Sequence, residues 1–309
     1  MDFTNLPPTE PFEQLRSKSC QFYLFGLHLG KSKAPLLCNT IFKQLGINWN
    51  YQIEETDQKS KFHERFASDN VIGSAVTMPN KVAFLSEVDH TDEIGTGVGA
   101  INTVYTRLSP TGEKLKIGTN TDTVGIKESF LQTEAVEIAN SNNGAPGLVY
   151  GGGGASRSAV YALYKFFGCK QVYIINRDKG EINDLKASMN QSAPYIDIVH
   201  IETPEQANNC GQPKLAVLCV PNFSPSTPSE ILAKETLSVF MNRSTGAVLE
   251  MCYNPVVVTE LYKEFEASGW IVISGITAMI YQGLTQISLW SGYSIKELPL
   301  EEAMAAVSQ

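Results

Sequence analysis

The sequence lacks the features that mark membrane and secreted proteins. No stretch reaches the roughly 18 consecutive apolar residues that a membrane-spanning helix needs. The amino-terminal segment, residues 1–14, is polar and acidic, without the basic and apolar regions of a secretory signal. We therefore expect a cytoplasmic protein that does not bind a membrane.

Positive charge is also scarce. The chain has 24 lysines and arginines against 32 aspartates and glutamates, which gives a net charge of −8. A nucleic-acid binder needs a basic surface to displace phosphate counterions, so we expect no nucleic-acid partner. A small anion can still bind, because local cations and helix ends decide that.

Cysteine and histidine are few and scattered. The six cysteines include no C-x-x-C pair, and in a chain of 309 residues they indicate reduced thiols rather than a disulfide framework. The four histidines show no ligand spacing, so we expect no metal site. A chain of this length suggests two domains, or one large one, and can bury a stable core.

The first part of the chain alternates between two hydrophobic patterns. We expect strands over 21–26, 48–53 and 71–79, and helices from Pro35 to Gly46 and near 58–68. A hairpin or surface turn is expected at 108–115, a helix at 123–132 and a linker or entry loop at 139–146. Strands that alternate with helices predict a parallel sheet and the α/β class.

A glycine-rich turn opens the second part. Residues 147–150 read as a strand, 151–154 as a glycine turn, 155–167 as a helix and 171–176 as a second strand. This order predicts the first half of a dinucleotide-binding fold, in which glycines let the backbone approach a pyrophosphate at a helix N-terminus. A flexible glycine linker is the alternative, but a linker would not join two apolar runs so tightly. Further strands are expected at 197–201, 214–220, 246–250 and 270–273, and two helices after Gly275.

The end of the second strand bears on cofactor choice. An arginine here would pair with the 2′-phosphate of NADP, whereas an acidic residue would bind the ribose hydroxyls of NAD. The sequence has both, in Asn176-Arg177-Asp178. Arg177 could also be a solvated loop cation. Asn176-Arg177 gives NADP a slight preference, and NAD remains possible.

Lys81 and Asp122 are candidate catalytic residues. Lys81 follows a strand in VTMPNK, and Asp122 begins a helix after a turn. Removal of hydride from an alcohol requires a group that takes the hydroxyl proton, and a lysine can do so where its surroundings favour the neutral amine. A carboxylate beside it would orient the lysine and share the proton. By composition alone these two residues indicate little, because lone lysine and aspartate residues are usually surface charges.

Several motifs in order resemble the shikimate/quinate dehydrogenase family, from about residue 22 to 297. FGLHLGKSKAPLLCN is similar to the family's substrate loop, and VTMPNK to its catalytic lysine motif. GAINT (99–103) and GTNTDTVG (118–125) resemble its asparagine and aspartate motifs, and GGGGASRSAVYAL its glycine loop. YNP (253–255) and GITAMIYQGLTQISLW (275–290) resemble its closing segments. No motif decides alone, but their shared order makes coincidence improbable.

The resemblance implies a fold, domain ranges and residue roles. Residues 1–125, completed by helices in 276–309, would form an α/β substrate domain, and 126–275 a Rossmann-type, doubly wound NAD(P) domain. Lys81 and Asp122 would be the catalytic pair. The substrate-binding residues would be Ser32, Thr77, Asn102, Thr121, Tyr253 and Gln282. The cofactor-binding residues would be Gly151, Gly153, Gly154, Ala155, Ser156, Asn176 and Arg177. Without the resemblance, Gln282 could be a polar helix-face residue and Tyr253 a core aromatic.

Some positions depart from the family pattern. Ala34 replaces the second serine of the substrate loop, and Ala75 replaces the asparagine before V-T-x-P. Leu218-Cys219-Val220-Pro221 stands for Asn-Ala-Thr-Pro, Ser274 for the aspartate before G-L-G, and Thr277 for its second glycine. Lost hydrogen-bonding groups can change which substrate fits.

Three functions are therefore weighed. The favoured one is an active dehydrogenase of shikimate, quinate or a related cyclic hydroxy acid, working as a monomer or homodimer. A second is a ligand-sensing protein on the same scaffold, because a fold does not guarantee its function. A third is a dehydrogenase of a larger or less polar ring acid admitted by the two alanines. The intact Lys81–Asp122 pair favours an enzyme.

Overall fold

The chain divides into two compact units. The computed structural model describes residues 6–30 and 32–307, so Lys31 of the predicted substrate loop lies outside the described residues, as do the extreme ends of the predicted domain ranges. Unit 1 contains Met1–Thr121 and Met279–Gln309, and unit 2 contains Asp122–Ala278. The predicted boundaries at 125/126 and 275/276, and the domain roles, stay predictions.

Unit 1 is built on a six-stranded sheet. Its strands are β1 (Cys20–Gly26), β2 (Trp49–Glu55), β3 (Gly73–Val76), β4 (His90–Thr91), β5 (Thr103–Leu108) and β6 (Lys114–Thr119), in the order β2-β1-β3-β5-β6-β4. Its helices are α1 (Phe12–Ser17), α2 (Ala34–Gln44), α3 (Lys59–Phe66), α4 (Asn80–Ala83), α5 (Glu93–Val98) and α14 (Leu300–Val307), with 3-10 turns η2 (Phe84–Glu87) and η3 (Ile295–Glu297). Helix α13 (Gly275–Ser291) crosses the unit boundary.

This first sheet is mixed, so the prediction of a parallel sheet was wrong for part of it. β1 pairs in parallel with β2 and β3, as expected for strands joined through helices. β5 instead runs antiparallel to both β3 and β6. The tight turn over 109–113 joins β5 directly to β6, and a short turn can only connect antiparallel strands. The predicted hairpin at 108–115 is thereby confirmed.

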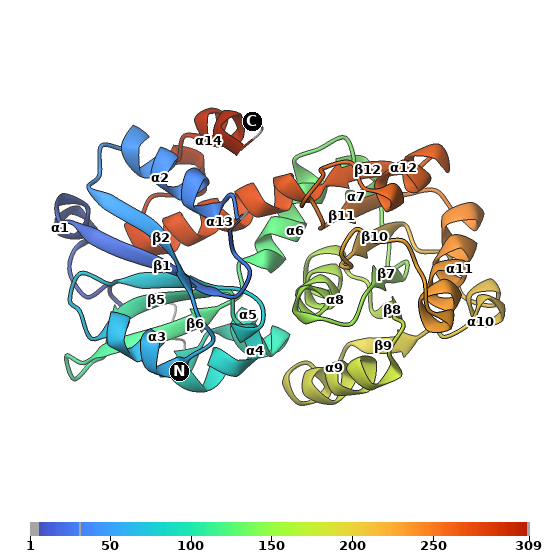
Figure 1. Ribbon diagram of the computed structural model, residues 1–309, viewed down its shortest axis with the longest axis horizontal. Helices are drawn as coiled ribbons and strands as arrows, with labels where there is room; N and C mark the ends of the chain where they lie inside the picture. The colour runs from blue at the N-terminus through green and yellow to red at the C-terminus, as the bar shows by residue number, and fades with distance from the viewer. Residues whose placement is uncertain (1–5, 31, 308–309) are drawn as a thin grey trace. The chain divides into compact units, whose positions relative to one another are not determined.

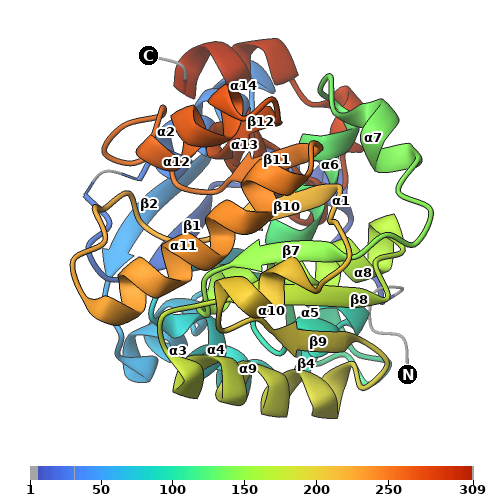
Figure 2. The same cartoon turned by 90° about the vertical axis from the view of Figure 1, so that its right-hand side faces the viewer.

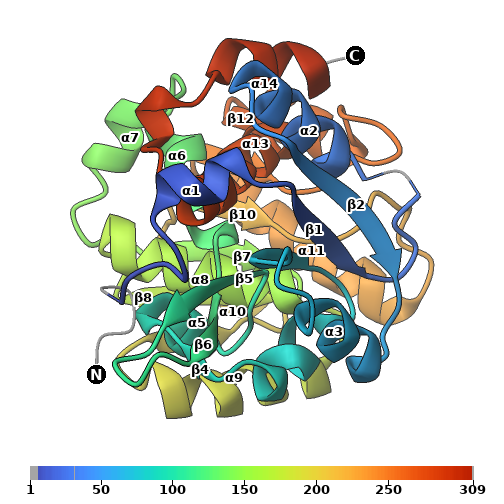
Figure 3. The same cartoon turned by 90° about the vertical axis from the view of Figure 1, so that its left-hand side faces the viewer.

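Helices cover both faces of the first sheet. α2, α13 and α14 lie together on one side of β1 and β2, and α3 lies on the other (Figures 1 and 3). Phe22 packs against Trp290 of α13, with ring centroids 4.4 Å apart and the rings tilted by 31°. Phe25 points to the opposite face and packs on Phe62 of α3 at 5.5 Å. The three-residue offset between Phe22 and Phe25 puts them on opposite faces, because successive strand side chains alternate.

Unit 2 carries a second, fully parallel sheet. Its strands are β7 (Gly147–Tyr150), β8 (Gln171–Ile175), β9 (Asp197–His200), β10 (Leu215–Leu218), β11 (Ala247–Glu250) and β12 (Ile271–Ser274). The order is β12-β11-β10-β7-β8-β9, which Figure 2 shows face on. Its helices are α6 (Asp122–Leu131), α7 (Val136–Asn140), α8 (Gly154–Phe167), α9 (Lys179–Ser192), α10 (Pro204–Asn208), α11 (Pro228–Arg243) and α12 (Glu260–Ala267).

This strand order is that of the doubly wound dinucleotide fold, with three strands on either side of a reversal between β7 and β10. The expected fold class is confirmed. The predicted strands of unit 2 all form, and the segment expected as a linker at 139–146 begins with the last residues of α7.

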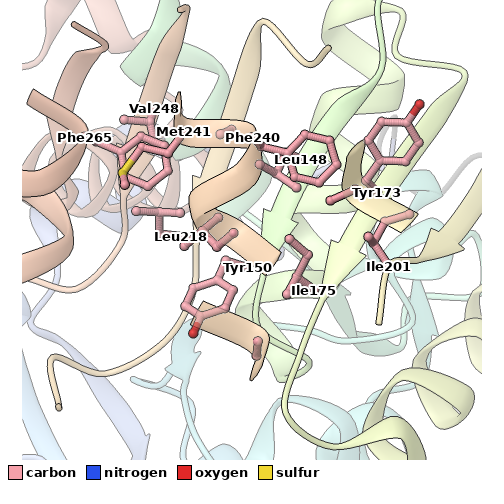
Figure 4. Packing of buried hydrophobic residues seen from close by; sticks show 14 of the residues in the cluster. Leu148, Tyr150, Tyr173, Ile175, Ile201, Leu218, Phe240, Met241, Val248 and Phe265 are labelled. Carbon is pink, nitrogen blue, oxygen red and sulfur yellow. The ribbon is translucent and has the colours of Figure 1, made fainter. Parts of the chain in front are cut away.

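One core of unit 2 lies between its sheet and α11 and α12. Figure 4 shows Phe240 and Met241 of α11 and Phe265 of α12 against Leu148 and Val248 of the strands. These five side chains are at most 8% exposed. Within residues 6–30 and 32–307, no helix combines the length and the apolar character needed to cross a membrane.

We expect Gly73→Ala to destabilise unit 1. A Cβ at Gly73 would overlap the indole of Trp290, which is 1% exposed and donates a 3.0 Å hydrogen bond from Nε1 to the carbonyl of Val104. Overpacking of this kind costs about 1–3 kcal/mol of unfolding free energy. Urea denaturation measures the loss. Gly30→Ala is the control, since a Cβ there meets nothing within 4 Å. Equal unfolding free energies for the two variants would contradict the packing argument.

Glu250 should make stability depend on pH. This residue is 1% exposed, and burial raises the pKa of its carboxyl group from 4.5 to about 7, although Cys252 N and Thr259 Oγ1 donate hydrogen bonds of 3.0 and 2.9 Å to it. Because the folded pKa lies above the unfolded one, this contribution to stability is present below pH 4.5 and is lost as the pH rises through about 7.

The variant Glu250→Gln removes this titration. Between pH 4.5 and about 8, we expect the wild-type protein to lose about 3 kcal/mol more unfolding free energy than the variant. Denaturant titrations across that range measure the difference. Glu137→Gln, which changes an exposed glutamate of α7, should follow the wild type. Parallel curves for the wild type and Glu250→Gln would refute the expectation.

Candidate functional site

A glycine turn links the first strand of unit 2 to helix α8. Gly151, directly after β7, has φ +123°, a conformation that side chains disfavour, and its N–H donates to the carbonyl of Ile175 at 2.8 Å. A Cβ on Gly151 would also lie 3.1 Å from the carbonyl oxygen of Cys219 on the neighbouring β10 connection. Both constraints make glycine necessary at this crossing of the chain.

The amino end of α8 is suited to phosphate. Gly153 is the N-cap of this 14-residue helix, and no side chain caps it. A Cβ on Gly153 would meet nothing within 4 Å, so the space beside the turn is open. Ser156, in the first turn of α8, is fully buried, and its Oγ has no hydrogen-bond partner among the described residues. Open space, helix N–H groups and a buried hydroxyl fit the pyrophosphate of a dinucleotide. Gly154 and Ala155 begin the same helix.

The segment after β8 lies against this glycine turn. A Cβ on Gly152 would come within 2.7 Å of Asn176 Nδ2 and 2.9 Å of Glu181 Oε2. Asn176 donates to Glu181 at 2.8 Å and to the carbonyl of Asp178 at 3.0 Å. Asp178 caps α9 by accepting from the N–H groups of Gly180 and Glu181. The polar side chains of Asn176 and Glu181 therefore lie directly against the glycine turn.

Arg177 is held by a partner that the sequence did not suggest. Its Nη1 donates to Oε1 of Glu230, in the first turn of α11, 53 residues along the chain. The guanidinium also lies 5.9 Å from the ring centroid of Phe223. Arg177 is therefore not a freely solvated loop cation.

A buried polar network occupies unit 1. Asn102 Oδ1 accepts from the Thr121 N–H at 2.7 Å and from Thr103 Oγ1 at 2.7 Å. Gln282 Oε1, on α13, lies 3.3 Å from both Asn102 Nδ2 and Thr121 Oγ1. Gln286, one helical turn further, donates to Thr103 Oγ1 at 2.9 Å. The structure thus brings three predicted substrate-binding residues, Asn102, Thr121 and Gln282, within hydrogen-bonding distance.

Lys81 and Thr77 follow β3. Thr77 N–H donates to the carbonyl of Phe25 at 2.8 Å, which continues the β1–β3 pairing past the end of the strand. Lys81 is the second residue of α4, and its carbonyl accepts from Ile101 N–H at 2.8 Å, next to Asn102. Ser32, in the loop before α2, accepts from the Ala34 N–H at 3.3 Å. The backbone bond between Lys81 and Ile101 places Lys81 next to the segment that contains Asn102 and leads into β5.

Asp122 and Tyr253 lie within electrostatic range of each other in unit 2. Asp122 is the first residue of α6 and is 9% exposed. Burial raises the pKa of Tyr253 to about 12, and the negative charge of Asp122 contributes to the rise. The Tyr253 hydroxyl is therefore protonated at neutral pH and can donate a hydrogen bond. Lys81 belongs to unit 1 and Asp122 to unit 2, and their pairing stays a prediction.

Sequence reasoning missed three polar residues: Glu230, which pairs with Arg177; Glu250, which accepts from Cys252 N–H; and Gln286, which donates to Thr103. Thr227-Pro228-Ser229-Glu230 carries a recognisable capping-box pattern, which the structure contains. That pattern indicates a helix start but not that the carboxylate would meet Arg177. For Gln286, its spacing of four from Gln282 was the available signal.

Residues that depart from the family pattern lie at the start of α2, in β3, after β10 and at the start of α13. Ala34 is the first residue of α2 and Ala75 lies in β3, and both side chains are buried. Cys219 N–H donates to the carbonyl of Tyr150 at 2.7 Å, so its backbone supports the glycine turn. Thr277 lies in the first turn of α13.

Comparisons with known proteins agree with this organisation. Residues 24–104 match the family model described as the shikimate dehydrogenase substrate binding domain. A quinate dehydrogenase of Emericella nidulans is 37% identical over 306 residues, which cover 93% of this chain and 93% of that protein. The pentafunctional AROM polypeptide of Eremothecium gossypii is 30% identical over 92% of this chain, but this chain spans only 18% of that polypeptide.

Solved structures share the fold. Quinate dehydrogenase from Corynebacterium glutamicum in complex with NAD has a TM-score of 0.75 at 21% identity, covering 94% of this chain and 99% of that one. Shikimate 5-dehydrogenase from Thermus thermophilus in complex with NADP(H) and shikimate has a TM-score of 0.71 at 22% identity, covering 94% and 98%. The chain therefore belongs to the shikimate/quinate dehydrogenase family, as an NAD(P)-dependent oxidoreductase of that type.

Proposed function

We propose that this protein oxidises a ring hydroxyl of quinate, with shikimate or a related cyclic hydroxy acid as the competing substrate. The observation that carries the choice is the similarity to the Emericella nidulans quinate dehydrogenase, which extends over 93% of both chains. Ala34 supports it. Quinate bears one more hydroxyl than shikimate, on the carbon that carries the carboxylate, and an alanine in the substrate loop leaves room where a serine hydroxyl would stand.

The network of unit 1 would bind the substrate hydroxyls. Asn102, Thr121 and Gln282 offer amide and hydroxyl groups that are already oriented by bonds among themselves and to Thr103. Such a preorganised set discriminates strongly, because a substrate without the matching hydroxyl leaves a buried polar group unpaired. Ser32, Thr77 and Tyr253 would complete the binding set.

Lys81 would take the proton of the reacting hydroxyl as its carbon loses hydride, and return it in the reducing direction. Asp122 would orient the lysine and share the proton. The bound nicotinamide dinucleotide supplies the hydride acceptor. In this scheme residues 1–125 with 276–309 bind substrate and 126–275 bind cofactor, with Gly151, Gly153, Gly154, Ala155, Ser156, Asn176 and Arg177 as the cofactor contacts.

The dinucleotide can be NADP or NAD. Sequence alone gives NADP a slight preference through Asn176-Arg177. That preference requires the guanidinium of Arg177 to bind a 2′-phosphate while it is also paired with Glu230. A cytoplasmic location and a monomeric or homodimeric state stay predictions as well.

Lys81→Ala should lower kcat by about 10²–10⁴-fold with NAD(P)H binding unchanged, because a general base contributes that much to proton transfer. The assay follows NAD(P)H formation with quinate and shikimate, each offered with NAD and NADP. Lys43→Ala, an exposed lysine of α2, removes the same charge and should keep full activity. Dinucleotide binding without turnover of either acid would favour a different ring acid or a sensing role.

Ala34→Ser tests the substrate preference. The serine hydroxyl would occupy space next to Ser32 in the loop before α2. We expect the ratio of kcat/KM for quinate to that for shikimate to fall by about tenfold, the effect of about 1.4 kcal/mol of differential binding. Steady-state kinetics with both acids and a fixed saturating cofactor give the ratio. An unchanged ratio would show that Ala34 does not select the substrate.

A further inference from the structure

Glu230 and Arg177 form an ion pair that joins α11 to the end of β8. The Arg177 side chain is 53% exposed, whereas the Glu230 side chain is only 9% exposed. The arginine can therefore contact solvent and a ligand, whereas the glutamate is buried beneath it.

Hydrogen bonds hold the Glu230 carboxylate in place. Its Oε2 accepts from Ser226 N–H at 3.0 Å, Ser226 Oγ at 3.2 Å and Thr227 N–H at 3.0 Å, while Oε1 accepts from Arg177. The backbone bonds of Ser226 and Thr227 lower the pKa of Glu230 to about 2. The group is therefore charged at every physiological pH, and it cannot turn away from Arg177 without breaking the capping box of α11.

The pair stands at the carboxyl ends of β7 and β8, next to the glycine turn. Tyr150, the last residue of β7, has a pKa raised to about 12 by burial, and the charges of both Glu230 and Arg177 act on it. Arg177 itself follows Asn176, which lies against Gly152. Since the turn over 151–154 is where a dinucleotide's pyrophosphate would bind, the pair lies where its adenosine ribose would follow.

The surrounding charge is negative. Two cations, Arg177 and Lys179, are accompanied by four carboxylates, and both cations are paired: Arg177 with Glu230, and Lys179 with Glu202 at 2.9 Å. The other two carboxylates, Asp178 and Glu181, are bonded to Gly180 N–H and Asn176. A 2′-phosphate would bring further negative charge next to these groups, whereas a ribose diol would bring hydrogen-bond donors to them.

We infer that Glu230 is a specificity-determining residue, which neutralises Arg177 and makes this protein prefer NAD to NADP. The inference rests on the proposed dinucleotide site of unit 2 and reverses the slight preference for NADP drawn from Asn176-Arg177. On this inference, Glu230 of α11, and not Arg177 alone, determines whether NAD or NADP is preferred.

The test compares Glu230→Gln with Glu235→Gln. Glutamine is also accepted in a capping box, so the first variant should fold, and a thermal melt checks this. The control removes the same charge from an exposed position of the same helix. Fluorescence titrations with NADH and NADPH give both dissociation constants without any substrate. We expect the wild type and the control to bind NADH more tightly, and Glu230→Gln to shift the NADPH/NADH ratio toward NADPH by about tenfold.

Arg177→Ala completes the cycle. In the wild-type background, Arg177→Ala should change the NADPH/NADH affinity ratio little, because Glu230 already neutralises the guanidinium. In the Glu230→Gln background, it should abolish the increase in NADPH affinity. An equal ratio in the two glutamine variants, or a tenfold loss of NADPH binding on Arg177→Ala alone, would overturn the inference. Because binding is measured without substrate, failure to oxidise quinate or shikimate would count against the proposed reaction and not against the role of Glu230.

Discussion

The reversal of strand order between β7 and β10 is the constraint on which the cofactor site depends. Connections leave these neighbouring parallel strands toward opposite faces of the sheet, so their carboxyl ends separate and leave room for a ligand. Gly151 bends the chain there, its N–H donates to the carbonyl of Ile175, and a Cβ on it would lie 3.1 Å from the carbonyl oxygen of Cys219. The glycine turn and the start of α8 follow directly from β7 at this reversal.

The first sheet depends on a segment far along the chain, because α13 packs against it. Trp290 fills the space over Gly73 and bonds Val104, while Gln282 and Gln286 on the same helix bond the Asn102–Thr103 end of β5. One helix therefore supplies both packing and polar groups. Stability of the sheet and geometry of the candidate substrate site are coupled through it, so a change that displaces Trp290 should also disturb Gln286 and Gln282.

The parts that could be predicted from sequence are those with a local cause. The glycine turn, the hairpin near 108–115 and the strands of unit 2 each have a signal within a few residues. The antiparallel placement of β5 beside β3 has none, because it depends on which strand edge is free when the hairpin docks. The pairing of Arg177 with Glu230 was equally invisible, since 53 residues and two strands separate them.

Glu230 and Glu250 show why residue type alone does not give a role. Glu230 lies in the first turn of α11 and Glu250 is the last residue of β11, and both are buried. Nothing in the sequence distinguished them from the other carboxylates. Glu230 receives two backbone N–H groups and a guanidinium, and its pKa falls to about 2. Glu250 receives one backbone N–H and one hydroxyl, burial outweighs them, and its pKa rises to about 7. The balance between burial and the donors around the carboxyl group decides whether it is a permanent anion, as at Glu230, or titrates near neutral pH, as at Glu250. A fixed anion offsets the positive charge of a neighbouring arginine at every physiological pH, whereas a titrating carboxyl group makes the stability of the fold depend on pH.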